Sequence, residues 1–386
     1  MRCKLGDISE ITKLAGYEFT KYIKYIPDGE IIAVRALNLK NGALVLDDIQ
    51  RISKEVSETL PRSQLHKNDI VLSYTGTLGE CAQIREDGKY HLAPNVCKIT
   101  PNDSVVNPNF LFQYIRCEKF KQTLINYAHG STQPTIPMST IRDIPVDIPD
   151  DLEKQGKIAA ILSILDEKIA INRAINDNLE QQARTLYQRM FIDNPVSEGY
   201  MGTLSDIADI TMGQSPNGSS YNEDGNGAVF FQGRAEFGFR FPSVRLYTTE
   251  PKRMACANDT LMSVRAPVGD LNVAYTDCCI GRGLAAIHSK SNQQSFVLYT
   301  MFSLHKQLDV FNGEGTVFGS INRTALTELP IFIPSDREIV KFEAIVAPID
   351  AAIRNNYEEI CRLEKIRDAL LPKLMSGELD VSAIEL

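Results

Sequence analysis

The chain has 386 residues, of which 43% are hydrophobic and 23% are charged, and its formal net charge at pH 7 is −8. A single hydrophobic core stops growing at about 250–300 residues, so a chain of this length is expected to form two or three cores. The sequence excludes a protein that crosses a membrane by helices, because no apolar run approaches the ~20 residues required. The negative charge argues against a general nucleic-acid coat.

Eight cysteines are scattered along the chain, and only Cys278 and Cys279 are close neighbours. There is no CxxC pair and no Cys/His cluster with zinc spacing, so no metal site is expected. The first residues lack the apolar core of a signal peptide. These features predict a cytoplasmic protein whose cysteines are reduced.

Two kinds of segment alternate along the chain. Short apolar runs separated by Gly, Asn, Asp and Pro are typical of strands and turns, and longer runs with helical periodicity follow each strand-rich segment. The expected order is a strand-rich domain at 1–150, a helix within 151–198, a second strand-rich domain at 199–334, and a helix within 335–386. One further helix is expected inside each domain, at 109–126 and at 294–310.

The second half of the chain repeats the first. Lys4–Ile11 (KLGDISEI) returns as Thr203–Ile210 (TLSDIADI), and the Asn-Asp pair at 68–69 returns at 258–259. The Ile-Pro pair at 148–149 returns at 333–334. Two diverged copies of one unit predict two similar sites held in a fixed relation.

The two helical segments share a seam of apolar residues that recur in steps of four and three, from Ile158 to Met190 and from Phe342 to Leu374. This spacing is typical of a coiled coil, and the first seam spans roughly 50 Å at ~1.5 Å per residue. Asn172 and Asn356 occupy equivalent seam positions, where a buried Asn fixes register. The predicted seam residues are Leu165, Ile169, Asn172, Leu179, Ile349, Ile353, Asn356 and Leu363.

Such helices could pack separately on their own domains or pair with each other. We favour antiparallel pairing, because the seams have equal length and the intervening domain lets the chain return. Pro348 interrupts the second seam, and proline breaks helix interiors, so the second helix is expected to start or kink near it.

Motifs for catalysis are weak. Phe311–Gly315 matches the FxGxG loop with which many methyltransferases hold S-adenosylmethionine, but no clear strand–turn–helix unit surrounds it. The chain has no GxxxxGK[ST] phosphate loop and no evident nuclease pattern. We therefore expect no catalytic residue and no cofactor in this chain.

Arginines at turns of the second copy are candidates for binding DNA. Arg265 follows an apolar strand, and Arg282 lies between two glycines that would let it approach a surface closely. Arginine suits the guanine edge and phosphate, although a loop arginine is more often solvated or ion-paired. Gln232, Arg234 and Arg240 add further donors.

The matching loops of the first copy display different residues, with Tyr74 and Thr75 where the second copy has Val264 and Arg265. Two domains that recognise different DNA sequences would show this pattern, and so would two copies that diverged without selection for function. The complete set of candidate DNA-binding residues is Ser73, Tyr74, Thr75, Thr77, Asn95, Ser131, Thr132, Gln133, Gln232, Arg234, Arg240, Arg265, Arg282, Thr316 and Asn322.

The chain resembles the specificity subunits of type I restriction–modification systems over almost its whole length. The resemblance is carried by 261–270 with 280–287, by 129–136 (HGSTQPTI) running on to Ile144-Pro145 and Gln155, and by the Ser-Gly-Glu helix end at 376–378. Among the departures of the second copy from the first, it has Ile339 where the first has Gln155 and Arg367 where the first has Ala183.

The resemblance implies an α+β fold in which two strand-rich target recognition domains, at 1–150 and 199–334, are joined by two helices as an antiparallel coiled coil with pseudo-twofold symmetry. Each domain would read one half of a split, asymmetric site on double-stranded DNA, and the spacer helices at 151–198 and 335–386 would set the gap. Two modification subunits with adenine methyltransferase activity would dock on the chain, and restriction subunits with translocase and nuclease activity would join them.

Two other functions stay open at this point. The chain could be a self-contained DNA adenine methyltransferase that uses the Phe311–Gly315 loop, or a coiled-coil adaptor that does not touch DNA.

Overall fold

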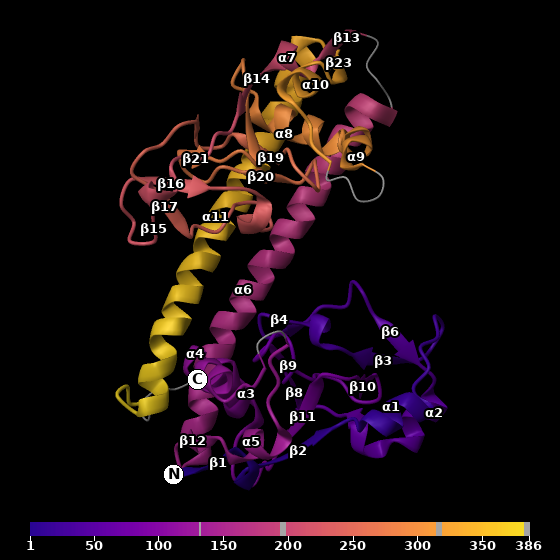
Figure 1. Cartoon of the computed structure of the whole chain (residues 1–386), viewed down its shortest axis with the longest axis vertical. Helices are drawn as coiled ribbons and strands as arrows, with labels where there is room; N and C mark the ends of the chain where they lie inside the picture. The colour runs from indigo at the N-terminus through magenta and orange to yellow at the C-terminus, as the bar shows by residue number, and fades with distance from the viewer. Residues whose placement is uncertain (131–132, 194–197, 314–318, 382–386) are drawn as a thin grey trace. The chain divides into compact units, whose positions relative to one another are not determined.

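The structure, a computed structural model, describes residues 1–130, 133–193, 198–313 and 319–381. The chain divides into two compact units, the first formed by Met1–Ala170 with Glu359–Leu386 and the second by Ile171–Glu358. Each unit contains one strand-rich domain and a stretch of both long helices (Figure 1). The units therefore differ from the four consecutive segments expected above, because each long helix contributes to both of them.

The domain of the first unit contains two four-stranded sheets. One has the order β2–β11–β8–β9 with antiparallel neighbours, and the other has the order β6–β3–β10–β7 with β3 and β10 parallel. The strands of the two sheets are β2 Ser9–Lys13, β11 Val96–Pro101, β8 Ile70–Ser73, β9 Cys81–Gln83, β6 Gln50–Ile52, β3 Ile31–Val34, β10 Tyr90–Leu92 and β7 Gln64–Leu65. Two strand pairs are β1 Arg2–Lys4 with β12 Pro145–Asp147 and β4 Leu39–Lys40 with β5 Ala43–Leu44. The helices are α1 Gly16–Tyr22, α2 Lys54–Thr59, α3 Pro108–Arg116, α4 Glu118–Asn126 and α5 Met138–Asp143.

The second unit repeats this topology. Its sheet β14–β22–β19–β20 has the antiparallel order of β2–β11–β8–β9, and its second sheet, β15–β17–β16–β21–β18, again has one parallel pair, β16 with β21. The strands are β14 Ala208–Met212, β22 Leu284–Ser289, β19 Thr260–Ser263, β20 Leu271–Val273, β15 Tyr221–Asn222, β17 Leu246–Thr248, β16 Ala228–Phe231, β21 Cys278–Ile280 and β18 Met254–Ala255, with β13 Gly199–Thr203 pairing with β23 Pro330–Pro334. The helices are α7 Leu204–Ile207, α8 Gln294–Ser303, α9 His305–Asp309 and α10 Arg323–Thr327. The sequence repeat is thus a repeat of sheet order.

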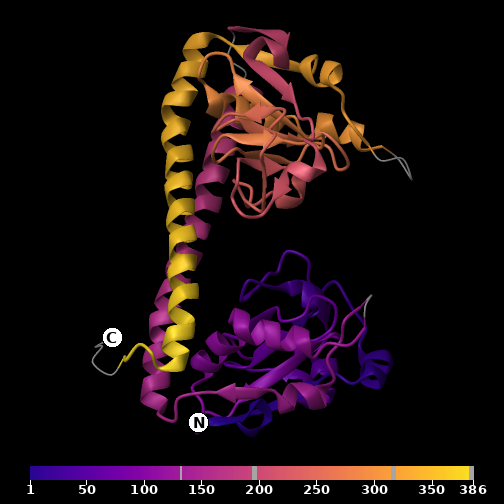
Figure 2. The same cartoon turned by 60° about the vertical axis from the view of Figure 1, so that its left-hand side comes forward.

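Two long helices, α6 Leu152–Tyr187 and α11 Asp336–Ser376, run antiparallel within each unit (Figure 2). In the first unit Asp166 of α6 contacts Arg367 of α11, and Lys168 contacts Glu359. In the second unit the ring of Tyr187 lies 5.6 Å from that of Phe342, and Asn176 contacts Asn356. Together with the two strand-rich domains, the paired helices confirm the α+β fold expected from the sequence.

The paired helices also complete the core of each domain. Ile158, Leu162 and Leu374 belong to the core of the first unit, and Tyr187 and Phe342 belong to that of the second. The two interpretations of the apolar seam therefore both apply, since the helices pair with each other and pack on their domains.

Two details of the expected helices are corrected. The helices predicted at 109–126 and 294–310 are each two helices. The first two meet at Cys117, whose thiol caps α4 by accepting from the Phe120 amide, and the second two meet at Leu304. The second long helix does not begin near Pro348 but runs from Asp336 through it. Pro348 and Ala344 are both exposed. Water can therefore satisfy the carbonyl that loses its partner, which is how a helix tolerates proline there.

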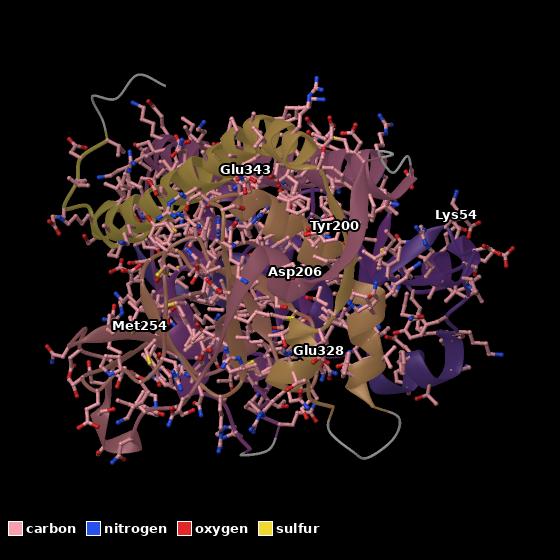
Figure 3. The ribbon with its side chains drawn as sticks, turned by 90° about the horizontal axis from the view of Figure 1, so that it is seen from above. Lys54, Tyr200, Asp206, Met254, Glu328 and Glu343 are labelled. Carbon is pink, nitrogen blue, oxygen red and sulfur yellow. The ribbon has the colours of Figure 1, made fainter. Side chains whose placement is uncertain are left out.

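Figure 3 shows strand β13 of the second unit with Tyr200, and helix α7 with Asp206. The Asp206 carboxylate accepts a 2.7 Å hydrogen bond from the Thr203 amide.

In the described part of the chain, no helix has the length and apolar character needed to cross a membrane.

Candidate nucleic-acid interface

A buried serine organises the same turn in both domains. Ser263, at the end of β19, donates a 2.7 Å hydrogen bond to the Pro267 carbonyl and accepts one of 3.0 Å from the Asp270 amide. Ser73, at the end of β8, donates to the Thr77 carbonyl and accepts from the Glu80 amide at 3.1 Å. Since Ser73 is fully buried, its expected role in DNA contact is corrected: the hydroxyl holds the turn.

In the first domain, three loops meet at this turn. The Tyr74 amide donates to the Asn95 carbonyl at 3.2 Å, and the Ile136 amide donates to the Tyr74 carbonyl at 3.0 Å. Thr75 forms a bridge with Thr135, and their hydroxyls are 3.2 Å apart. Loops from three distant stretches of sequence thus form one surface.

The side chains on this surface are mostly polar and uncharged. Thr77, Asn95 and Gln133 are exposed, and Tyr74 is half-buried with the Lys13 ammonium 5.4 Å from its ring centre. Burial raises the pKa of Tyr74, so its hydroxyl stays protonated and can donate a hydrogen bond. Ser131 and Thr132, also expected here, lie outside the described residues.

The second domain brings the matching loops together. The Val264 amide donates to the Gly283 carbonyl at 2.9 Å, and the Ala266 amide donates to the Gly319 carbonyl at 2.9 Å. Arg265 forms a bridge with Ser320, as Thr75 does with Thr135. The backbone scaffold of the two candidate surfaces is therefore the same.

The side chains on the second surface are basic. Arg265 and Arg282 are exposed, and neither has an ion pair with any of the residues that the structure describes. Gln232 is exposed beside them, while Arg234 is paired with Asp270. Arg265 and Arg282 are thus the guanidinium groups of this surface that remain open to a phosphate or a base edge.

The register of the strands shows which positions correspond. Val96 pairs with Ser73, and Leu284 pairs with Ser263, so Asn95 corresponds to Gly283 and Pro94 to Arg282. The same loop position therefore carries proline in one domain and arginine in the other.

The glycines beside Arg282 have a different role from the one expected. A Cβ at Gly281 would lie 2.8 Å from the Gln232 carbonyl oxygen, and one at Gly283 would lie 2.9 Å from it. Because real Cβ atoms do not approach so closely, the glycines allow this loop to pack against the end of β16. The two glycines thereby fix the backbone on either side of Arg282. The Arg282 amide donates a 3.3 Å hydrogen bond to Ser215 Oγ.

Asn322, another candidate of the second domain, follows Ser320 and Ile321, which bond to the turn of Arg265. Asn322 is exposed, but its side chain accepts a 2.9 Å hydrogen bond from the Ala325 amide and so caps α10. Thr316 lies outside the described residues.

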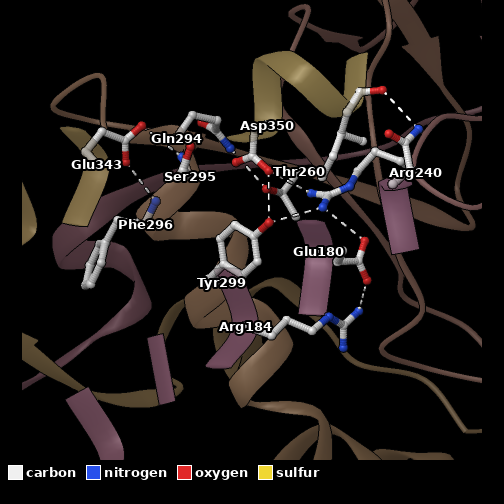
Figure 4. A network of polar contacts seen from close by, with 12 residues as sticks. Glu180, Arg184, Arg240, Thr260, Gln294, Ser295, Phe296, Tyr299, Glu343 and Asp350 are labelled. Carbon is white, nitrogen blue, oxygen red and sulfur yellow. Dashed lines mark hydrogen bonds and ion pairs between the residues drawn. The ribbon is translucent and has the colours of Figure 1, made fainter. Parts of the chain in front are cut away.

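Arg240 is the expected DNA-binding residue that the structure places in the interior. Its side chain is only 4% exposed and forms ion pairs with Glu180 at 3.0 Å and Asp350 at 3.4 Å (Figure 4). It also donates to Tyr299 Oη at 3.1 Å. Burial alone would lower the pKa of Arg240, but the neighbouring Tyr299 and the two carboxylates raise it, so it stays charged. A guanidinium held in this way cannot reach DNA, and the expectation for Arg240 is wrong.

None of the predicted seam residues is exposed. Ile169, Asn172 and Ile353 are buried, and the half-buried members are Leu165, Leu179, Ile349, Asn356 and Leu363. The seam also contains a residue missing from that set, Asn176, which is 3% exposed. Asn176 lies four residues after Asn172, and its contacts with Ile353 and Asn356 of the second helix identify it as a seam residue.

At the pairs Gln155/Ile339 and Ala183/Arg367, one copy makes a polar contact and the other places an apolar side chain in its core. Gln155 accepts a 2.7 Å hydrogen bond from the Asn107 amide, whereas the corresponding Ile339 is buried in the second core. Arg367 forms an ion pair with Asp166 at 3.2 Å, whereas Ala183 belongs to the second core.

The residues that the sequence offered for cofactor or metal binding begin with the motif at 311–315. Of the Phe311–Gly315 motif, Asn312 accepts a 2.5 Å hydrogen bond from the Val268 amide and so supports the turn with Arg265, and residues 314–315 lie outside the described part. The described residues contain no group of three His, Cys, Asp or Glu side chains arranged to hold a metal ion. Cys279 is fully buried.

Known proteins with similar sequences or folds share one description. A family model for the type I restriction modification DNA specificity domain matches residues 1–181. A type I restriction enzyme specificity subunit of Methanocaldococcus jannaschii is 30% identical over 348 residues, which cover 84% of this chain and 81% of that protein. The HindI specificity subunit of Haemophilus influenzae is 24% identical over 376 residues, covering 75% of this chain and 81% of the relative. The crystal structure of the S subunit of a type I restriction–modification system from M. genitalium has the same fold, with a TM-score of 0.58, 17% identity and coverage of 97% of this chain and 96% of that one. The chain belongs to the family of type I restriction enzyme specificity subunits, the non-catalytic DNA-recognition components of these systems.

Proposed function

We propose that each strand-rich domain of this chain reads one half of a split, asymmetric DNA site, and that the paired helices set the gap between the halves. One observation carries the proposal: the two domains keep the same turn, organised by Ser73 or Ser263, and vary the residues that it displays. Polar uncharged groups in one domain and two open arginines in the other suit different base sequences.

We further propose that the helices bind two methyltransferase subunits, which restriction subunits then join. Two features support a role for α6 and α11 in binding protein. The segment 335–386 contains 11 acidic and 7 basic residues, which disfavours DNA. Large apolar side chains are also exposed on both helices, at Ile164, Ile171 and Ile175 and at Val340, Ile345 and Ile366.

The functions left open by the sequence are less well supported. Membership of the specificity-subunit family argues against a self-contained methyltransferase. An adaptor without DNA contact would have no use for two unpaired arginines on a shared loop surface.

The test is to express the chain with its methyltransferase subunits and to map methylated adenines across a genome. We expect one gapped sequence with two different halves. Arg265→Ala and Arg282→Ala should relax or abolish recognition of one half only, because a bidentate contact to a base contributes about 1–3 kcal/mol of discrimination. Arg62→Ala, at an exposed position outside both candidate loop surfaces and both long helices, is the control and should leave both halves intact. Methylation without a gapped sequence, or unchanged by both loop variants, would refute the proposal.

A further inference from the structure

Asp166 of α6 and Asp350 of α11 are equivalent residues of the two copies, each directly after a seam residue, Leu165 or Ile349. Asp166 accepts a 2.7 Å hydrogen bond from Gln113 Nε2 of α3. Asp350 accepts one of 2.9 Å from Tyr299 Oη of α8. The helix of each recognition domain thus contacts its long helix through the same aspartate position.

The donors themselves correspond. Gln113 and Tyr299 both come three residues after a fully buried phenylalanine, Phe110 in α3 and Phe296 in α8. The contact between domain and helix is therefore part of the duplicated scaffold, although the donor has changed from an amide to a phenol.

An arginine of the domain joins each aspartate. In the first unit, Asp166 pairs with Arg116 of α3 and also with Arg367 of α11 at 3.2 Å. In the second unit, Arg240 reaches from the segment between β16 and β17 to Glu180 of α6 and Asp350 of α11 (Figure 4). One charged side chain therefore connects the recognition domain to both helices in each unit. It is Asp166 in the first unit and Arg240 in the second.

These contacts are directional, whereas the apolar core around them is not. Apolar burial has no preferred orientation and permits small sliding movements of a domain on the helices. Arg240, a planar guanidinium shared between carboxylates of two helices, and Asp166, a carboxylate shared between two guanidinium groups, each have few arrangements that satisfy all partners. A buried or partly buried ion pair adds little net stability compared with apolar residues of the same size, so stability alone does not explain why both copies contain such a cluster, partly buried around Asp166 and more deeply buried around Arg240.

The anchors are also connected to the candidate DNA-binding turns. The Arg240 carbonyl accepts a 2.9 Å hydrogen bond from the Val273 amide of β20, the strand that follows the turn of Ser263. In the first unit the connection runs through the chain: Arg116 ends α3, α4 begins at Glu118, and Lys121 of α4 pairs at 2.8 Å with Glu80, whose amide bonds to Ser73 Oγ. A shift of either anchor would therefore move the turn of its domain.

We propose that Asp166 with Arg116 and Arg367, and Asp350 with Arg240 and Glu180, are positioning residues that fix the orientation of each recognition domain on the helix pair. They thereby set the direction in which each turn faces its half of the DNA site. The proposal rests on the function proposed above and assigns the gap selectivity partly to these anchors rather than to the helix length alone.

The experiment neutralises one anchor without leaving a buried charge, in the complex of the full chain with its methyltransferase subunits. The variant Arg240→Met/Glu180→Gln/Asp350→Asn is compared with the matched first-unit variant Asp166→Asn/Arg116→Met/Arg367→Met. Thermal unfolding reports folding, and methylation kinetics on duplexes with gaps shorter and longer by one base pair report positioning.

We expect the folded second-unit variant to methylate the wild-type gap about 10–100-fold more slowly, since a misplacement of ~1 Å can cost about 100-fold. The preference over altered gaps should fall at the same time, while the base sequence of both halves stays the same. The first-unit variant should show the same loss of rate and the same loss of gap preference, with both half-sites unchanged. Wild-type rates and gap preference in folded variants would overturn the proposal.

Arg240→Lys provides a second test if a neutralised variant does not fold. It keeps the buried charge but cannot join both carboxylates in one plane, so relaxed gap preference would support the anchor and wild-type preference would overturn it. Failure of the proposed function is recognised separately, because the unmodified complex would then prefer no gapped duplex.

Discussion

The side-chain amide of Asn356 in α11 donates a 2.8 Å hydrogen bond to Asn176 Oδ1 in α6, within the second unit. Asn176 Nδ2 in turn donates to the Ile353 carbonyl at 3.2 Å. Since Asn176 is buried, a shift of one helix by a turn would leave its amide without partners in an apolar seam. The pair therefore selects one register of the two helices.

Replacing both amides, in Asn176→Leu/Asn356→Leu, should keep or raise the free energy of unfolding, because apolar seam residues pack better than polar ones. Loss of the register should at the same time broaden the range of gaps that the complex methylates. Urea unfolding and methylation of duplexes with different gaps would check these outcomes. A variant with lower stability and unchanged gap preference would show that the pair only supports the fold.

The sequence predicted the features that local patterns encode. Strand-and-turn composition and the four-three spacing gave both domains and both long helices, because alternating or helical burial follows directly from residue spacing. The equivalence of the turns followed from the repeat itself. The sequence nevertheless predicts that Ser73 contacts DNA, because the neighbouring residues do not indicate that its hydroxyl donates a hydrogen bond to the Thr77 carbonyl inside the turn.

Contacts between distant residues could not be predicted in this way. Arg240 has the loop context of an exposed arginine, and its partners Glu180 and Asp350 lie 60 and 110 residues away. Pro348 is a case in which a local rule fails. Proline is expected to end a helix because it removes a backbone hydrogen bond, but α11 continues through this position. At an exposed position, water and the packing of the remaining helix offset this loss.

The two turn-forming serines should have similar energetic importance. Ser263→Ala would leave the Asp270 amide and the Pro267 carbonyl without partners in the turn, and Ser73→Ala would do the same to Glu80 and Thr77. Each change should lower the free energy of unfolding by about 1–3 kcal/mol. Chemical denaturation would measure this, with the exposed Ser243→Ala as a control that should change stability by less than ~0.5 kcal/mol. Equal effects of all three changes would contradict the role of the buried hydroxyls.

Pro348→Ala should stabilise the second unit. An interior proline costs a helix about 3 kcal/mol, of which water at the exposed Ala344 carbonyl offsets a part, and the greater freedom of alanine in the unfolded chain costs up to ~1 kcal/mol, so a net gain of less than about 2 kcal/mol is expected. The midpoint of urea unfolding should rise accordingly. Ala347→Gly, next to it in the same helix, should instead lower stability by about 1 kcal/mol. A loss of stability in Pro348→Ala would mean that the packing of α11 depends on the local backbone geometry at the proline.

Alkaline pH should destabilise the protein through its buried thiols. Burial raises the pKa of Cys81, Cys97 and Cys278 from 9.0 to about 12. Between these values the unfolded chain loses the thiol protons while the folded chain keeps them, so the unfolded state binds fewer protons and stability falls as pH rises from 9.0 towards about 12. Below pH 9 the contribution is fully present. Urea unfolding at a series of pH values should show this slope, and Cys97→Ala should reduce it even though the cavity lowers stability at every pH. Cys256 is exposed, so Cys256→Ala should leave most of the slope in place. A slope unaffected by Cys97→Ala would assign the alkaline instability to other groups.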